Sequence, residues 1–184
     1  MKKEVTTYYL EMTDPSQLVP KRVERDDLTV AKVGTPCPEF NRFLYSAVGG
    51  DLNWRSCLKW NYERWLEHLS RPGTATWVVY VDGTPAGYAE MQRRASAEVE
   101  ILCFGLLPQF RGQGFGAHLL TEALEKAWAM DARRVWLHTC TLDLQPHALS
   151  NYLARGMRVF KQDTGIIDIP DDPPAWPGVR PCTS

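Results

Sequence analysis

The residues whose types and spacing could do chemistry are concentrated in a glycine-rich turn, 111–117, between a predicted strand and a predicted helix. Gly112, Gly114 and Gly116 alternate with other residues and remove side chains where the backbone must approach a ligand closely. The first N–H groups of the helix have no partner within it and lie at the positive end of its dipole. Such a turn binds phosphate oxygens, and Arg111 can add a charge-assisted contact at its edge.

Other phosphate-binding and structural interpretations of this turn fit less well. A Walker loop requires Gly-Lys-Ser/Thr, and the turn contains no lysine. A dinucleotide fingerprint, GxGxxG/A, is formally matched by Gly112, Gly114 and Ala117 and would indicate an NAD(P)-binding oxidoreductase. That fingerprint should open a βαβ unit and be followed about 20 residues later by an acidic residue. Here it follows an antiparallel hairpin, and the residues at the expected position are 134–137, with nothing acidic between them and Asp143. A turn that binds nothing remains an alternative.

The elements that must position this turn follow from hydrophobic periodicity. Alternating, β-branched or aromatic runs predict strands, with a hairpin turn at Asp82-Gly83, over 6–12, 77–81, 85–91, 98–107, 134–141, 159–161 and 165–169. Helical spacing predicts helices within 39–69, broken at 49–51, and over 114–130 and 146–155. Residues 13–38 are polar and proline-rich and are expected to contribute little to the core. The order of strands, helix, strand, helix and strand predicts a mixed α/β fold.

Length and composition narrow the classes of function. A chain of 184 residues with 44% hydrophobic residues is expected to form one domain with its own core. A formal net charge of −1 gives no field that would attract nucleic acid, and no apolar run is long enough for a membrane span. The odd number of cysteines argues against a disulfide framework or structural zinc: Cys37, Cys57, Cys103, Cys140 and Cys182. We therefore expect a cytoplasmic protein without a metal.

From residue 98 onward the sequence resembles the GNAT superfamily of acetyl-CoA-dependent N-acetyltransferases. The coenzyme motif of that family, Q/R-x-x-G-x-G/A, is matched by Arg111, Gly114 and Gly116 within EVEILCFGLLPQFRGQGFGAHLL. A second block, 148–157, is similar to the helix and turn that the family writes A..LYe..GF. Both blocks occur in the order typical of the family, with a strand between them, and with the preceding hairpin they cover roughly 77–161.

The resemblance implies a GNAT-like α/β (α+β) fold, a mixed and mostly antiparallel central sheet flanked by helices. It implies one domain over 1–169, with a coenzyme-binding core at 77–161 and a variable acceptor-binding part at about 13–70. The tail, 170–184, carries five prolines and is expected to be an extended or disordered wrap. The implied activity is transfer of an acetyl or other acyl group from acetyl-CoA to a primary amine, by direct attack in a ternary complex.

Direct transfer needs a neutral amine, a donor for the developing oxyanion and protonation of the departing thiolate. Counted back from Arg111, Glu100 falls where some members, notably the histone-acetylating branch, place their general base, which acts directly or through water. Glu98 shares its strand face and is a second choice. His138 has a suitable intrinsic pKa and is an alternative base. Water alone is a further one.

The resemblance also implies the remaining roles. A backbone N–H near Phe104, where the strand of the family bulges and splays from its neighbour, would bind the oxyanion, and Tyr152 would be the acid that faces the coenzyme sulfur. Pantetheine would pair along 104–106. Gln145 stands where the family often has asparagine. The implied coenzyme contacts are Phe104, Leu106, Arg111, Gly112, Gln113, Gly114, Phe115, Gly116, Ala117, Gln145 and Asn151.

The acceptor is a small-molecule or peptide amine. Carboxylates expected to gather at the mouth of the cleft would suit a cationic amine: Glu90, Glu98, Glu100 and Asp143. Tyr45 and Trp54, on either side of the 49–50 break, are candidate pocket walls, and His138 is a further candidate acceptor contact. The sequence leaves open a homodimer. It also leaves open a non-catalytic acyl-CoA-binding sensor that keeps the turn without the transfer chemistry.

Overall fold

A computed structural model describes residues 1–142 and 147–169 of the chain. Within these residues one seven-stranded sheet has the order β2-β3-β4-β5-β6-β1-β7. Its strands are β1 (Lys2–Met12), β2 (Leu28–Lys32), β3 (Thr74–Val81), β4 (Thr84–Arg93), β5 (Glu98–Leu106), β6 (Arg134–Cys140) and β7 (Arg158–Asp168). The helices are α1 (Pro38–Gly49), α2 (Tyr62–Leu69), α3 (Phe115–Trp128) and α4 (His147–Ala154). Short 3-10 helices are η1 (Pro15–Gln17), η2 (Ser56–Lys59) and η3 (Pro108–Phe110).

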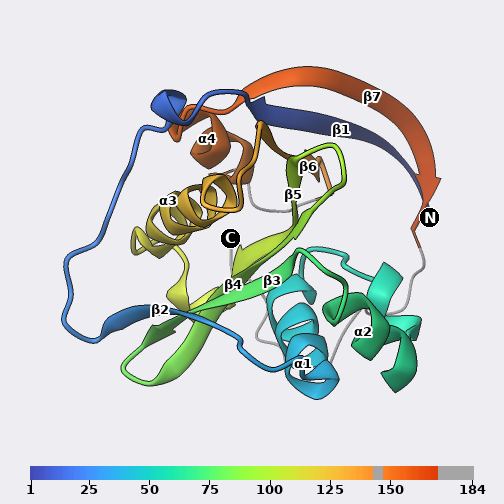
Figure 1. Ribbon diagram of the computed structural model, residues 1–184. Helices are drawn as coiled ribbons and strands as arrows, with labels where there is room; N and C mark the ends of the chain where they lie inside the picture. The colour runs from blue at the N-terminus through green and yellow to red at the C-terminus, as the bar shows by residue number, and fades with distance from the viewer. Residues whose placement is uncertain (143–146, 170–184) are drawn as a thin grey trace.

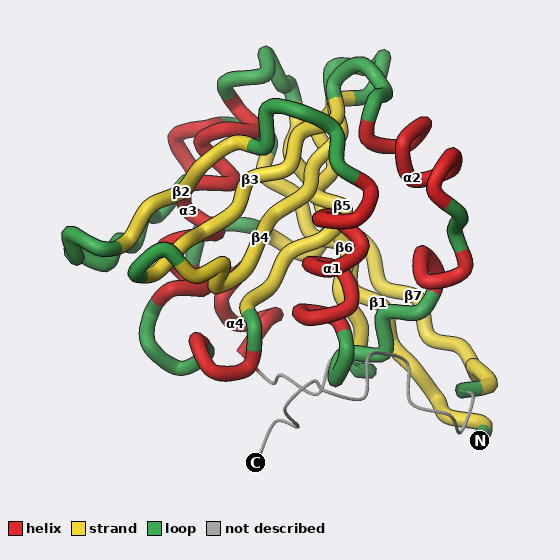
Figure 2. Tube along the Cα trace, turned by 90° about the horizontal axis from the view of Figure 1, so that it is seen from below, coloured by secondary structure: helices red, strands yellow, loops and turns green. Residues whose placement is uncertain are grey.

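The helices cover the two faces of the sheet. Figure 1 shows α3 and α4 on one face and α1 and α2 on the other, while β1 and β7 form a long curved ribbon. Figure 2, seen from below, shows α1 and α2 in front of the strands and α3 behind them. All neighbouring strands are antiparallel except β5 and β6. The predicted mixed α/β fold with a mostly antiparallel sheet is therefore confirmed.

The strongest local signals placed their elements correctly. Asp82 and Gly83 have φ angles of 48° and 72°, both positive, as a two-residue hairpin turn requires. The helix predicted at 114–130 is α3, which begins after Gly114 because that residue takes a φ of 85°. The break at 49–51 separates α1 from α2, as expected.

Two sequence expectations need correction. The stretch 13–38 contains a strand, β2, whose Leu28 and Val30 pack against the core; its short alternation was too weak a signal. The two closing strands expected at 159–161 and 165–169 are one strand, β7. It stays continuous through its polar middle because β1 pairs with it along its length, with one register shift at Tyr9/Leu10.

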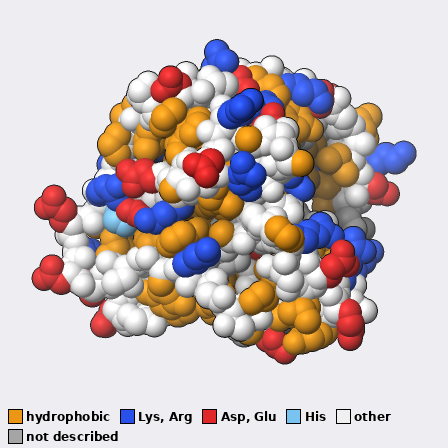
Figure 3. Space-filling view, viewed as in Figure 1, with side chains coloured by type: hydrophobic (Ala, Val, Ile, Leu, Met, Phe, Trp, Pro, Cys, Tyr) orange, Lys and Arg blue, Asp and Glu red, His pale blue; other side chains and the backbone are white. Residues whose placement is uncertain are grey.

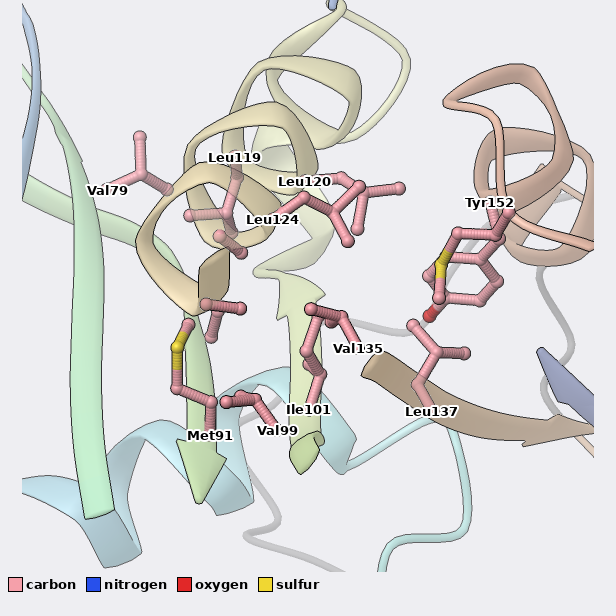
Figure 4. Close-up of a cluster of buried hydrophobic side chains, with 14 of the residues drawn as sticks. Val79, Met91, Val99, Ile101, Leu119, Leu120, Leu124, Val135, Leu137 and Tyr152 are labelled. Atoms are coloured by element: carbon pink, nitrogen blue, oxygen red, sulfur yellow. The ribbon is translucent and has the colours of Figure 1, made fainter. Parts of the chain in front are cut away.

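The main core lies between the sheet and α3. Leu119, Leu120 and Leu124 are fully buried and face Val99 and Val135 of the two parallel strands (Figure 4). On the opposite face there are two smaller clusters: Tyr45 of α1 packs with Trp65 and Leu69 of α2, and Leu44 and Val48 of α1 pack with Val78 and Tyr88 of the sheet. The core under α3 therefore includes residues at which β5 and β6 are paired.

Strands β5 and β6 separate after their first three residues. The two strands pair only at Glu98↔Arg134, Val99↔Val135 and Glu100↔Trp136, and no later pair joins them in the described residues. A register shift against β4 accompanies the separation: Met91 faces Ile101 and Glu90 faces Cys103. Leu102 is therefore an extra, unpaired residue, a β-bulge that bends its strand. The sheet opens at this point.

The described part of the surface shows no large region of one charge in the view of Figure 3. Basic and acidic side chains are interspersed over the face in Figure 3, in keeping with the net charge of −1. Among the described residues, no helix combines the length and apolar character that crossing a bilayer requires. The expectations for Asp143, Gln145 and the tail at 170–184 fall outside the described residues.

The segment after β1 crosses the end of α4 so closely that Gly156 is required. Gly156 has a φ of 94°, and a Cβ there would lie 1.9 Å from the carbonyl oxygen of Gln17. We expect G156A to lower the free energy of unfolding by more than about 3 kcal/mol, because strain and a backbone clash add. Gly83 is the matched control: its φ is also positive, but a Cβ there meets nothing within 4 Å. G83A should cost only about 1 kcal/mol. Equal shifts of the urea midpoint in the two variants would contradict this account.

Candidate active site

A cavity of about 650 Å³ opens where β5 and β6 separate. This volume is typical of pockets that bind cofactors and substrates. The cavity is bounded by the separated strands, the glycine-rich turn, α4 and the segment after α1. Its lining includes Leu52, Asn53, Trp54, Ile101, Leu102, Phe104, Gly105, Leu106, Leu137, His138, Thr139, Ala148, Asn151 and Tyr152. Within 1–142 and 147–169, no three His, Cys, Asp or Glu side chains come together as metal ligands would.

The glycine-rich turn forms one end of this cavity. Gly112, Gly114, Gly116 and Ala117 all line it. Gly112 and Gly114 take positive φ angles of 75° and 85°, so the alternating glycines set the path of the backbone into the first turn of α3. Phe115 instead buries its side chain in the core, with 1% exposed, and leaves only its backbone for a ligand. The end of the cavity is therefore lined by backbone at the start of a helix.

The side chain of Arg111 is already engaged within the protein. Its Nη1 and Nη2 form an ion pair with the carboxylate of Asp51, and both side chains are largely buried. Its Nε donates to the Leu106 carbonyl at 3.0 Å, and its Nη2 to the Val48 carbonyl at 3.2 Å. The guanidinium thus ties the turn to the end of α1. The phosphate contact expected of Arg111 stays a prediction, and the geometry favours the backbone amides of the turn for that role.

Tyr152 lies where the two strands diverge. Its side chain hangs from α4 with the hydroxyl end directed toward β6 near Leu137 (Figure 4). Its ring packs edge-on against Phe104 of β5, with centroids 5.8 Å apart. The neighbouring Asn151 donates from Nδ2 to the Gly116 carbonyl at 3.2 Å, which fixes α4 to the first turn of α3. Of the expected site residues, the structure therefore brings Tyr152, Phe104 and Asn151 together with the turn.

The irregularity of β5 lies two residues earlier than the sequence indicated. It was expected near Phe104, and the structure places it at Leu102. Both residues line the cavity. Because an extra residue in a bulge is left out of the ladder, its backbone groups are available to a ligand.

Of the expected carboxylates, the three that the structure describes, Glu90, Glu98 and Glu100, do not line the cavity. Glu98 is 3.1 Å from Nη1 of Arg134, and Glu100 forms an ion pair with Nη2 of Arg94. Neither lines the cavity, although Ile101, the residue after Glu100, does. Each carboxylate on this strand is drawn to a basic neighbour instead of to a common centre.

Sequence reasoning missed the partners of Glu90. This residue is 3% exposed, with Oε1 at 2.6 Å from Nε2 of His68 and Oε2 accepting from Nδ2 of Asn41 at 2.9 Å. The cluster lies on the α1/α2 side of the sheet. A signal for it was present, because Glu90 stands between the apolar residues Ala89 and Met91 in a predicted strand.

Of the two aromatic residues expected to line the pocket, Trp54 does so and Tyr45 does not. Trp54 lines the cavity. Tyr45 is 5% exposed and packs behind it, with ring centroids 5.3 Å apart, and burial raises the pKa of its phenol well above the usual value. His138 lines the cavity from β6 and is exposed, with its ring 5.9 Å from that of Tyr9.

Solved structures share the fold of this chain. A GCN5-related N-acetyltransferase from Sphaerobacter thermophilus gives a TM-score of 0.65 at 19% identity, over 88% of this chain and 50% of that one. Another from Kribbella flavida gives 0.62 at 17% identity, over 88% of this chain and 56% of that one. At these identities the likeness shows the fold alone, which is that of the N-acetyltransferases.

The sequence comparisons then give the family. A family model, Acetyltransferase (GNAT) family, matches residues 40–157, more than half of the chain. The chain belongs to the GNAT family of acetyltransferases, which confirms the resemblance. An uncharacterized N-acetyltransferase of Mycobacterium tuberculosis is 36% identical over 101 residues, 53% of this chain and 65% of the relative. One of Archaeoglobus fulgidus is 36% identical over 75 residues, 36% of this chain and 48% of the relative. The matches thus span less than two thirds of the length of these relatives.

The Arg111–Asp51 pair generates a prediction about stability. R111M leaves the Asp51 carboxylate buried without a partner, so we expect the free energy of unfolding to fall by about 3 kcal/mol. The double variant R111M/D51L removes both charges and should recover part of that loss. Denaturant unfolding without any ligand measures both. If R111M unfolded at the wild-type midpoint, the pair would not hold the turn.

Proposed function

We propose that the chain is an acetyl-CoA-dependent N-acetyltransferase that acts on a primary amine of a small molecule or peptide within a ternary complex. One observation carries this proposal. A single cavity runs from the bare backbone at the start of α3 to Tyr152 and the bulge at Leu102. It joins a place for a diphosphate to a place for acyl transfer. Membership of the GNAT family supports the same reaction class.

The cavity fits the coenzyme chemically. Its turn offers amides and no side-chain bulk at Gly112, Gly114 and Gly116, as a diphosphate requires. Its middle is apolar, and the facing edges of β5 and β6 are unpaired there, so an amide-containing arm can form the missing strand contacts. No aspartate or glutamate of the described residues lines the cavity. The expected contacts of Gln113, Phe115 and Leu106 would use their backbone.

Bound acetyl-CoA supplies a thioester whose acyl carbon a neutral amine attacks. The backbone N–H groups of the bulged segment, 102–104, donate to the oxygen that becomes negatively charged. Tyr152 donates its hydroxyl proton to the departing sulfur, because a phenol is protonated at neutral pH. The chain thus provides donors at both atoms where charge develops.

Glu100 is our proposed base. It lies next to Ile101 of the lining and is held by Arg94, so it accepts the proton of the amine through a bridging water. His138, which lines the cavity directly, is the alternative base, and solvent water is the other. Glu100 and His138 lie on different strands, β5 and β6, so substituting one at a time distinguishes which of them is the base.

The acceptor is proposed to enter between β5 and the segment after α1. Leu52, Asn53 and Trp54 bring residues from the region 13–70 to the cavity, in accord with an acceptor-binding role for that part of one domain over 1–169. Two structural neighbours are named for different acceptors. One is an aminoglycoside acetyltransferase from a soil metagenome, and the other is a ribosomal-protein-S18-alanine N-acetyltransferase of Escherichia coli. An acceptor panel should therefore contain both small amines and peptides.

The activity test follows release of free thiol from acetyl-CoA with that panel. We expect turnover with at least one amine, and a fall in kcat of about 100-fold in Y152F with unchanged affinity for CoA, because only the acid is lost. Tyr62, which is exposed on α2, provides the control variant Y62F, expected to behave as wild type.

E100Q separates the candidate bases. If Glu100 is the base, E100Q lowers kcat and removes the acidic limb of the pH–rate profile, whereas H138Q leaves that limb in place. Saturable CoA binding with no turnover across the panel would instead support a non-catalytic acyl-CoA sensor. Saturable NAD(P) binding without CoA binding would reject the assignment altogether.

A further inference from the structure

Arg155 is a buried cation that lines the same cavity. It follows the last residue of α4, and only 8% of its surface is exposed. Its backbone is fixed from both sides: its N–H donates to the Asn151 carbonyl at 3.1 Å, and its carbonyl accepts from Val19 at 3.1 Å. The side chain therefore starts from a well-defined position at the wall of the cavity.

The charge of Arg155 is not neutralised by any residue that the structure describes. Its one side-chain hydrogen bond runs from Nε to the carbonyl of the adjacent Ala154, at 3.1 Å. The other buried ionic side chains differ in this respect, since Glu11, Glu90 and Glu100 each have a basic partner. An arginine stays protonated even when buried, so it does not escape the cost of burial by losing its charge. Neither terminal nitrogen of Arg155 is hydrogen-bonded to a residue that the structure describes, and neither is among the fully enclosed polar atoms that lack a partner.

The surroundings of Arg155 select a negatively charged acceptor. The basic residues of lysine and arginine type that line the cavity are Lys21, Arg111 and Arg155, and no aspartate or glutamate is among the described lining residues. Arg111 is already paired with Asp51, so Lys21 and Arg155 carry the uncompensated charge. Lys21 is held near α3 because its N–H donates to Oγ1 of Thr121 at 3.0 Å.

The position of Arg155 relates it to the glycine-rich turn. Asn151, one helical turn earlier on the same face of α4, donates to the Gly116 carbonyl at 3.2 Å. Arg155 therefore starts about 6 Å further along α4 than a residue in direct contact with the turn. A long side chain spans such a gap, and Arg155 and the turn line one continuous cavity.

We propose that Arg155, assisted by Lys21, is the side-chain cation that binds the diphosphate of the coenzyme, opposite the backbone amides of 112–117. The proposal rests on the proposed function, because it takes acetyl-CoA as the ligand. It moves the cationic role from Arg111, the arginine of the motif, to an arginine outside it. A planar guanidinium with two free nitrogens suits bidentate contact with phosphate oxygens.

Calorimetry with truncated ligands tests this assignment. CoA carries both the diphosphate and a 3′-phosphate, dephospho-CoA carries only the diphosphate, and pantetheine carries neither. We expect R155M to weaken CoA and dephospho-CoA alike by about 30-fold and to leave pantetheine unchanged. R155K, which keeps the charge without the fork, should lie between R155M and wild type. R64M removes an exposed arginine of α2 outside the cavity and is expected to bind all three ligands as wild type does.

Each other result would overturn the assignment in a recognisable way. A loss confined to CoA would place Arg155 at the 3′-phosphate, and an equal loss for pantetheine would make its role structural. An R155M variant that binds CoA as tightly as wild type would remove Arg155 from the site while leaving the proposed function intact. A wild-type chain that binds none of the three ligands would reject both. Thermal melts check the fold, and R155K and R155Q carry the comparison if R155M does not fold.

Discussion

The separation of β5 from β6 is the constraint on which the rest of the site depends. Two parallel strands that pair at only three positions expose backbone groups that the sheet would otherwise use. The unpaired Leu102 bends β5 just after its last pair with β6. Helix α3 packs on Val99 and Val135, which lie in the part of the two strands that stays paired. The opening is therefore built into a rigid sheet, and a ligand that enters it meets fixed donors and acceptors.

Charge pairing decides how the walls of the opening are held and what they leave free. The Arg111–Asp51 pair spans 60 positions in the sequence and joins the glycine-rich turn to the end of α1, which also carries the segment with Trp54. The proposed coenzyme side and the proposed acceptor side of the cavity thus share one buried interaction. Because that pair is internally neutral, the cavity owes its positive character to Lys21 and Arg155.

Local signals in the sequence predicted the elements, and pairings between distant residues explain what was missed. Asp82-Gly83 indicates a hairpin turn and Gly114 indicates the start of a helix, because these positions have positive φ angles that few other residue types adopt. The residues around Leu28 and Gln162 give no clear local strand signal; they are in strands because β3 pairs with the first and β1 with the second. For the site, the turn was singled out by its glycine spacing and Tyr152 by the family resemblance. The partners of Glu90 and Arg111 come from other elements, so no local pattern could predict them. The bulge at Leu102 depends on its register against β4, which no local pattern reveals.

The central claim is that the opening between β5 and β6 receives the coenzyme, with its diphosphate on the first turn of α3. Amide hydrogen exchange of the wild-type chain, with and without saturating CoA, tests it most directly. Slower exchange is predicted for the amides of 102–106 and 112–117, with α2 unchanged. Binding of CoA that leaves these amides exchanging as in the free protein, or that protects only other segments, would contradict it.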